Sequence, residues 1–224
     1  MMLRAENVSK RYFRQSGQAN HFYAVRDVSL ALEPGAVTVL MGRSGSGKTT
    51  LLHMLAGLLT PTEGRVWLDD SDVYAMDDRA LSRLRNARLG VVPQGRSAID
   101  TLTVTENILL PGSLCGKAPD MESARRWMEA LDIIHIGDAR PAQLSGGELR
   151  RMAIARALQQ GTDVLLADEP TGDLDDENTG RVLTLLGDAA KAGMAVLIVS
   201  HDSEAAQYAD RLLRMDGGAI ERQF

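Results

Sequence analysis

The chain has 224 residues, of which 25 are basic and 30 are acidic, so its formal net charge is −5. Hydrophobic residues make up 44% of it and charged residues 25%, which is typical of a folded domain and excludes a disordered or collagen-like chain. The single cysteine, Cys115, excludes an intrachain disulfide and indicates a reducing compartment. The negative charge argues against a general nucleic-acid scaffold, and we expect no nucleic-acid partner.

No segment is suited to crossing a membrane. The longest apolar stretch, residues 51–59, is interrupted by His53 and Gly57 and is far shorter than the ~18 residues that a span requires. The start of the chain reaches the acidic Glu6 without an apolar core, so a signal peptide is not indicated. We therefore expect a cytoplasmic protein that meets a membrane only through a partner.

The first predicted elements form an antiparallel layer. Val28, Leu30 and Leu32 alternate with small residues before a Pro-Gly turn, and we expect this strand to pair with residues 3–8 and 65–68. Short apolar runs farther along predict buried strands at residues 37–41, 89–92, 164–167 and 195–199. Helical patterns lie between them, at residues 48–58, 146–159 and 177–192, which predicts a parallel sheet with helices on its faces.

Residues 95–144 contain no convincing strand but several helix starts. Thr103 with Glu106 and Ser145 with Glu148 have capping-box spacing, and Pro119-Asp120 begins a further helix. We expect one α/β domain, in which residues 1–94 and 145–224 form the core and residues 95–144 an inserted helical subdomain. Residues 212–220 predict a closing hairpin.

A glycine-rich loop follows the strand at residues 37–41. Residues 42–49 fit the pattern G-x-x-x-x-G-K-[ST], and the predicted fold is therefore the RecA-like fold of P-loop NTPases. Such a loop turns backbone N–H groups toward phosphates, Lys48 would contact the β- and γ-phosphates, and the Thr49 hydroxyl would ligate Mg²⁺. The candidate nucleotide-binding residues here are Gly42, Ser44, Gly45, Ser46, Gly47, Lys48, Thr49 and Thr50. The alternative, a plain strand-to-helix turn, explains neither the Lys-Thr pair nor its position.

Polar side chains follow three other predicted strands. Because ligands bind at the carboxyl ends of parallel strands, we expect Gln94, Asp168, Glu169 and His201 to face the phosphate loop. Asp168 suits a water-mediated contact to Mg²⁺, and Glu169 can act on a water in line with the γ-phosphorus. Gln94 would contact Mg²⁺ or that water, and His201 the γ-phosphate. The catalytic candidates are thus Lys48, Gln94, Glu169 and His201, and the metal candidates Thr49, Gln94 and Asp168.

The segment Leu144-Ser145-Gly146-Gly147-Glu148 completes a set of motifs that, taken in order, resembles the ATP-binding subunit of ATP-binding cassette (ABC) transporters. The resemblance implies that two copies pack head to tail around two ATP molecules. Ser145, Gly146 and Gly147 of one copy would then contact the ATP of the other. It also assigns Asp175 to the interface and Tyr12 to stacking on adenine. Taken alone, Ser145 with Glu148 could be a simple helix cap, and an aromatic residue near a strand end, such as Tyr12, is more often plain packing.

Within the family, the chain most resembles lipoprotein-releasing and macrolide-exporting ATPases, through the extended stretch at residues 13–23 and the run at 166–175. This implies an Mg²⁺-dependent, homodimeric ATPase that drives a separately encoded transmembrane permease from the cytoplasmic face of the membrane. A soluble mechanical ABC ATPase is disfavoured because the chain has neither a long coiled coil nor a second cassette. Regulation of a membrane complex that transports nothing remains open.

Two further groups of residues invite interpretation. His21, His53 and His135 lack metal-ligand spacing, and we expect no zinc site. Arg79, Arg83, Arg85 and Arg88 form a basic run on a predicted helix. Such a run is usually a solvated helix face, although beside a membrane-bound partner it would meet anionic lipid.

Overall fold

The computed structural model describes residues 2–13, 21–116 and 118–221, and it confirms the antiparallel layer. This sheet has the strand order β2 (His21–Leu32), β1 (Leu3–Phe13), β4 (Glu63–Leu68) and β5 (Ser71–Asp72). Leu3 lies opposite Leu32 on one side and Leu68 on the other, which confirms the pairing of β2 with residues 3–8. The expected pairing of β2 with residues 65–68 is wrong, because β1 lies between β2 and β4 and pairs with both. The extended stretch at residues 13–23, one basis of the resemblance to lipoprotein-releasing ATPases, includes residues 14–20, which lie outside the described residues.

The predicted parallel strands form a second sheet, in the order β10 (Ala219–Glu221), β9 (Arg211–Asp216), β3 (Val37–Met41), β8 (Ala195–Ser200), β7 (Val164–Asp168) and β6 (Leu89–Val92). All neighbours pair in parallel except β10, which pairs antiparallel with β9 and confirms the closing hairpin. Because successive side chains of a strand point to opposite faces, Val39 and Leu40 belong to two different hydrophobic clusters.

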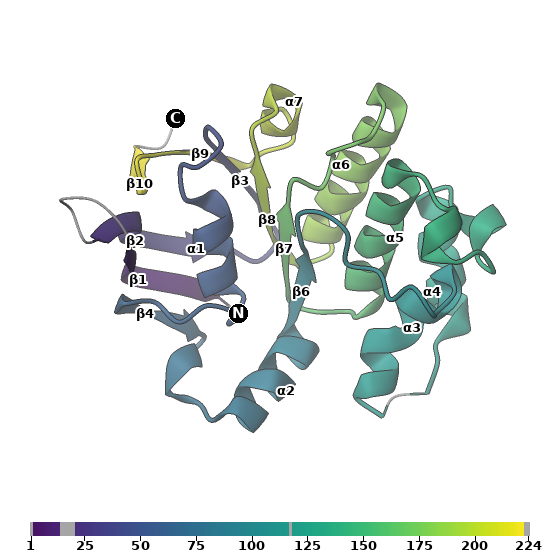
Figure 1. The fold of residues 1–224 in the computed structure, drawn as a ribbon, viewed down its shortest axis with the longest axis horizontal. Coiled ribbons are helices and arrows are strands. Elements are labelled where there is room, and N and C mark those ends of the chain that lie inside the picture. The colour runs from purple at the N-terminus through teal and green to yellow at the C-terminus, as the bar shows by residue number, and fades with distance from the viewer. Residues whose placement is uncertain (1, 14–20, 117, 222–224) are drawn as a thin grey trace.

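Helices cover both faces of the parallel sheet (Figure 1). Helix α1 (Lys48–Leu55) contacts β1 and β2 on one side and β7 and β8 on the other, so it fills the space between the two sheets. Helices α5 (Gly146–Gln159) and α6 (Asp176–Lys191) cover the opposite face, and α2 (Asp78–Arg88) packs on β6. The short helices η1 (Val73–Ala75) and α7 (Ser203–Ala206) complete these layers.

The segment at residues 95–144 is helical wherever the structure describes regular elements in it. It contains α3 (Val104–Leu114), α4 (Met121–Ala130), η2 (Ile134–Ile136) and η3 (Pro141–Gln143). The capping boxes at Thr103 and Ser145 are present, and Asp120 caps α4. Helix α5 packs on α3, α4 and β6, so it joins the helical segment to the parallel sheet. Over the described residues, no helix is both long and apolar enough to cross a membrane.

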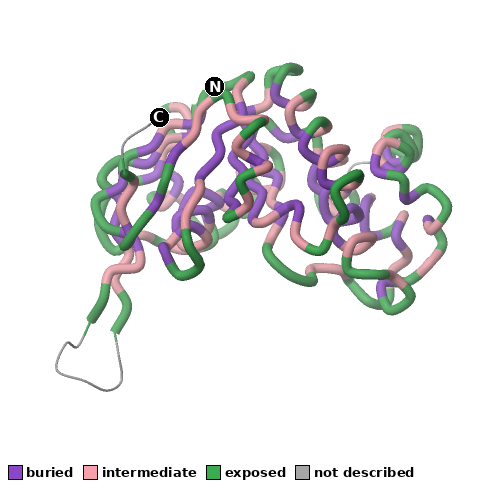
Figure 2. The backbone as a smooth tube through the Cα atoms, turned by 90° about the horizontal axis from the view of Figure 1, so that it is seen from above, coloured by how far each residue is buried: buried purple, intermediate pink, exposed green. Residues whose placement is uncertain are grey.

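The burial pattern agrees with these layers. In Figure 2 the buried backbone runs through the centre of the molecule, and exposed residues gather in the connecting segments at its periphery. The central strands β7 and β8 are buried along their whole length, which explains why the sequence reads there as continuous apolar runs.

Helix α1 ends at Leu55, three residues before the predicted end. Gly57 has a φ of +67°, which turns the chain away, and the carbonyls exposed by that turn receive partners from outside the helix. The Tyr74 hydroxyl lies 2.7 Å from the carbonyl oxygens of both Met54 and Leu59, and Arg85 donates to the Gly57 carbonyl at 2.9 Å. Burial raises the pKa of Tyr74, so this hydroxyl stays protonated.

The predicted basic face of α2 is therefore only partly solvated. Arg85 supports the end of α1, and Arg88 pairs with Asp163 and, at 3.2 Å, with Asp69. These partners come from loops distant in sequence, so the pattern of the helix alone could not have indicated them.

We predict that Tyr74→Phe lowers the free energy of unfolding by about 1–3 kcal/mol, because the part-buried carbonyls of Met54 and Leu59 lose the hydroxyl proton that they share. Urea unfolding measures this change. The control is Tyr208→Phe, because the Tyr208 hydroxyl has no hydrogen-bond partner among the described residues. This change should alter the stability by less than about 0.5 kcal/mol. Equal losses in the two variants would show that the Tyr74 hydroxyl does not stabilise the end of α1.

Candidate functional site

The glycine-rich loop is confined between backbone from two other strands. A Cβ atom at Gly47 would lie 2.1 Å from the carbonyl oxygen of Ala24, and one at Gly42 would lie 2.4 Å from that of Met215. Gly47 also has a φ of +106°, and it precedes α1 without a side-chain cap. The loop thus requires glycine for both space and conformation, and it leaves the N–H groups at the start of α1 available to an anion.

Lys48 lies over this loop. Its ammonium donates to the carbonyl oxygens of Gly42 at 2.7 Å and Arg43 at 3.0 Å, and the residue is 7% exposed. Ser46 differs from the other candidates of the loop, since its hydroxyl is buried without a hydrogen-bond partner among the described residues. The loop therefore holds a buried positive charge whose present partners are only neutral oxygens.

Most of the predicted site residues line one open cavity of about 1530 Å³. They come from β1, the loop after β3, the ends of β6 and β7, and the segment after β8, so strands distant in sequence meet at this edge of the sheet. The candidates in its wall are Tyr12, Gly42, Ser44, Gly45, Gly47, Lys48, Thr49, Thr50, Gln94, Asp168, Glu169 and His201.

Asp168 is a buried carboxylate at the end of β7. It is 1% exposed, and neither of its oxygens has a hydrogen-bond partner among the described residues. Burial raises its pKa, and the nearby Thr49 hydroxyl and Lys48 ammonium oppose that rise only in part. An unsatisfied carboxylate beside a threonine hydroxyl and a phosphate loop fits a hard divalent cation such as Mg²⁺.

The described residues contain no cluster of three or more His, Cys, Asp or Glu side chains that could hold a metal. A cation at Asp168 would therefore need phosphate oxygens and water to complete its coordination, which is how Mg²⁺ usually binds beside nucleotides.

Glu169 is held in place by three neighbours on β8 or just beyond it. Its backbone N–H donates to the Val199 carbonyl at 2.8 Å, and its carboxylate lies 3.3 Å from the Ser200 hydroxyl and 2.8 Å from Nδ1 of His201. Its φ of +50° is unusual for a residue with a side chain, and such strain is common at functional sites. The carboxylate is mostly buried, whereas the His201 ring is exposed.

Ser200 was missed by the sequence analysis. A hydroxyl directly after the predicted strand at residues 195–199, and directly before His201, was the available signal.

The aromatic wall of the cavity is larger than the sequence analysis predicted. Tyr12 stacks on Phe22, with ring centroids 5.8 Å apart and an angle of 29° between the planes, because these residues face each other across β1 and β2. Phe13, Phe22 and Tyr23 also line the cavity. Aromatic residues at paired positions of the predicted antiparallel strands were the signal that could have identified them.

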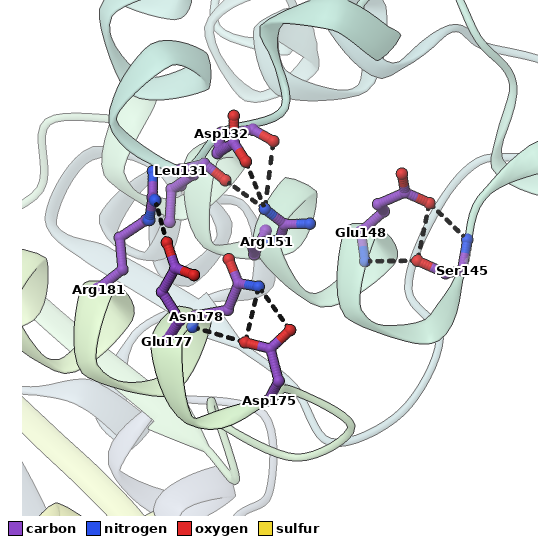
Figure 3. Close-up of polar contacts among 9 residues, drawn as sticks. All are labelled: Leu131, Asp132, Ser145, Glu148, Arg151, Asp175, Glu177, Asn178 and Arg181. Carbon is purple, nitrogen blue, oxygen red and sulfur yellow. Dashed lines mark hydrogen bonds and ion pairs between the residues drawn. The ribbon is translucent and has the colours of Figure 1, made fainter.

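Apart from the buried Ser46, which lines neither cavity, the remaining candidates lie in a different one. Ser145, Gly146, Gly147 and Asp175 line a hollow of about 490 Å³, shared with Arg151, Asp173, Leu174 and Asn178. Figure 3 shows its polar contacts. The Ser145 hydroxyl caps α5 by accepting from the Glu148 N–H at 3.3 Å, and the Glu148 carboxylate accepts from the Ser145 N–H at 2.7 Å.

Asp175 has a similar local role at the start of α6. It caps that helix by accepting from the backbone N–H of Asn178 at 2.8 Å, and it also accepts from the Asn178 side chain. These contacts lower the pKa of Asp175, as the Ser145 N–H lowers that of Glu148. Within one chain, the phosphate loop and the tip of α5 therefore belong to two separate sites.

Comparisons with known proteins agree with this geometry. Residues 25–172 match the family model described as ABC transporter. The chain is 38% identical to the lipoprotein-releasing system ATP-binding protein LolD of Aquifex aeolicus (strain VF5), over 98% of this chain and 96% of that protein.

Solved structures give the same result. The dimeric structure of MJ0796, a bacterial ABC transporter cassette, matches with a TM-score of 0.91 and 32% identity, covering 99% of this chain and 97% of that one. A post-hydrolysis dimer of MJ0796 bound to ADP and Pi matches with a TM-score of 0.90, again with 32% identity and the same coverage. A nucleotide-free ATP-binding cassette matches with a TM-score of 0.81 and 27% identity, covering 99% and 90%.

We predict that Asp168→Asn stabilises the nucleotide-free protein. Since the folded-state pKa of Asp168 is raised, the unfolded chain ionises first, and the wild type loses stability as the pH rises from the ordinary aspartate pKa of about 4 to the folded value. The amide does not ionise and so avoids that loss. The thermal midpoints of the two proteins should therefore be similar below about pH 4. Above that pH the variant should have the higher midpoint.

The same variant should lose the additional thermal stabilisation that Mg²⁺ gives in the presence of nucleotide. Asp188→Asn, which removes an exposed carboxylate from α6, is the control and should change neither quantity. An Asp168→Asn protein that is less stable than the wild type at neutral pH would contradict the argument from burial.

Proposed function

This chain belongs to the ABC transporter family and is an ATP-binding, ATP-hydrolysing cassette, and from that premise we propose that two copies close around two ATP molecules and drive a membrane permease. One observation carries the proposal: the phosphate loop and the tip of α5 lie in separate cavities of the same chain. Each ATP would bind between the loop of one copy and Ser145, Gly146 and Gly147 of the other. The dimeric structures of MJ0796 support this arrangement.

Nucleotide binding would begin at the loop. Its backbone N–H groups and the start of α1 receive the β-phosphate, and Lys48 moves from its carbonyl partners to the β- and γ-phosphates, where its charge is better paired. Thr50 lies near the α-phosphate. The Tyr12 ring, held by Phe22, stacks on the adenine, and Asp175 lies at the interface between the two copies.

The residues that would hold Mg²⁺ are Thr49, Asp168 and Gln94. The bound ion would neutralise charge on the β- and γ-phosphate oxygens. Asp168 contributes a carboxylate whose oxygens have no protein partner among the described residues, so cation or water contact removes the penalty of its burial.

Hydrolysis needs a base and a fixed water. Glu169 would accept a proton from a water in line with the γ-phosphorus, and its two partners, Ser200 and His201, keep the carboxylate turned into the cavity. His201 contacts Glu169 through Nδ1, so Nε2 is the ring nitrogen that would contact the γ-phosphate. A positioned base of this kind contributes roughly 10²- to 10⁴-fold in rate.

The membrane partner would be a separately encoded permease of a lipoprotein-releasing or exporter system. The likeness to LolD supports this assignment, and it implies that the homodimer acts on the cytoplasmic face of the membrane. We assign residues 95–144 to a helical subdomain that receives a cytoplasmic helix of the permease, and residues 1–94 and 145–224 to the catalytic core. Gln94 lies at the junction of the two, so the γ-phosphate can bias the position of the permease.

We predict that Glu169→Gln lowers ATP turnover by roughly 10²-fold or more, because the amide cannot accept the proton of the attacking water. ATP binding should persist, so the variant should accumulate as an ATP-bound dimer in size-exclusion chromatography. Glu177→Gln, at an exposed position of α6, is the control and should hydrolyse ATP normally. Turnover of Glu169→Gln within about threefold of the wild type would exclude Glu169 as the base.

We predict that Ser145→Arg leaves ATP binding to the monomer unchanged but abolishes turnover, because the long cation blocks the tip of α5 in the partner's site. Lys48→Ala should fail at the phosphate loop. Mixing these two inactive variants should restore turnover, since one of the two sites in a mixed dimer then has an intact loop and an intact tip.

The control for this experiment is Ser71→Arg, at the exposed first residue of β5 in the antiparallel sheet. An unaffected rate in Ser145→Arg would contradict sharing between copies. So would a wild-type specific activity that stays constant when the protein is diluted until it is monomeric.

A further inference from the structure

Two arginines of α5 hold the chain on both sides of Gln94. Arg150 donates through Nη1 to the carbonyl of Pro93 at 2.9 Å. Arg156 donates to the Ser97 carbonyl at 2.8 Å and to the Ser97 hydroxyl at 2.7 Å. The two arginines are separated by about 9 Å along the helix, at 1.5 Å per residue. The segment 93–97 is therefore fixed to α5 at two points, with Gln94 between them.

Arg150 is buried and Arg156 is partly buried, and among the described residues both guanidinium groups pair only with neutral oxygens. Arg150 is 7% exposed, and burial lowers the pKa of Arg156. No carboxylate among the described residues forms an ion pair with either side chain. Burying a cation in this way is costly, and an apolar side chain would pack the helix at less cost. What the planar guanidinium adds is a fixed direction for the backbone that it binds.

Helix α5 also carries the other half of the site. Its first residues are Gly146 and Gly147, and Ser145 caps it. Arg150 lies one turn farther on and also borders the segment after Glu169: a Cβ atom at Gly172 would lie 3.8 Å from Nη2 of Arg150. A displacement of the tip of α5 therefore reaches residues 93–97 through hydrogen bonds.

We propose that Arg150 and Arg156 make α5 and residues 93–97 move as one body, so that the ATP bound at Ser145 places Gln94 at the chain's own ATP. Arg156 and Ser97 are then positioning residues for hydrolysis, and they couple the two sites of the dimer. The inference rests on the proposed function, because it requires that the ATP at Ser145 belongs to the other copy.

The test is Arg156→Met, which keeps the length of the side chain and removes its donors. Turnover should fall by roughly 10-fold or more, as expected when a group at the reacting centre is misplaced. The Hill coefficient for ATP should fall toward 1, and the Mg²⁺ concentration for half-maximal turnover should rise. The affinity of the monomer for a fluorescent ATP analogue should stay within about twofold of the wild type, since the phosphate loop is unchanged.

The matched control is Arg125→Met, which removes an exposed arginine of α4 that pairs only with Glu129 in the described structure. Ser97→Ala should reproduce part of the loss, and its effect should disappear when it is combined with Arg156→Met. If Arg156→Met does not fold, the single variants Arg156→Lys and Ser97→Ala and their combination carry the same test. Lysine keeps the charge but cannot bind both Ser97 oxygens as the planar guanidinium does.

A folded Arg156→Met protein with wild-type turnover, Hill coefficient and Mg²⁺ dependence would overturn the proposal. So would effects of Arg156→Met and Ser97→Ala that simply add. The mixing of Ser145→Arg with Lys48→Ala separates this failure from that of the proposed function, because it reports the sharing of sites without depending on Arg156.

Discussion

The close approach of the backbone of two other strands to the glycine-rich loop is the constraint on which the rest of the structure depends. The carbonyl of Ala24 in β2 and that of Met215 in β9 occupy the space that side chains at positions 47 and 42 would need. The loop is therefore shaped by both sheets at once, and α1, which begins within it, fills the space between them. The position of α1 and the shape of the glycine-rich loop therefore cannot change independently. The end of α1 is held in the same way, by Tyr74 and Arg85.

A second property of the site is that its charges are incompletely paired in the nucleotide-free chain. Lys48 has only carbonyl partners, and Asp168 has none among the described residues. Both groups are buried, and the attraction of the Lys48 ammonium offsets only part of the cost of burying the Asp168 carboxylate. In the proposed complex, a triphosphate with its cation would satisfy both, because phosphate oxygens would pair with the ammonium and the cation with the carboxylate. Part of the free energy of binding ATP would then come from relieving the remaining cost of burial.

Much of this could be predicted from local sequence, because local rules determine it. The buried strands, both capping boxes and the residues at the carboxyl ends of the strands follow from periodicity, cap chemistry and the topology of parallel sheets. What the sequence could not supply were contacts between distant segments. Strand register and helix placement determine these contacts, and local sequence patterns do not reveal either of them. Examples are Phe22 beneath Tyr12, Ser200 beside Glu169 and the arginines around Gln94. The end of α1 shows the same difference: residues 56–58 continue an apolar helical pattern, yet Gly57 turns the chain, and nothing local marks the carbonyls that Tyr74 and Arg85 will bind.

The charges at the tip of α5 bear on why the proposed site would need a second copy. A helix N-terminus carries only about half a positive charge, and here the Glu148 carboxylate already accepts from the Ser145 N–H. An arriving phosphate must share this end of the helix with that carboxylate, and with Asp173 and Asp175 in the wall of the same cavity. Such a tip binds a free triphosphate weakly. In the proposed dimer, Lys48 and the loop of another copy would already neutralise most of the phosphate charge, so the tip would favour ATP that is held by a partner over ATP taken from solution.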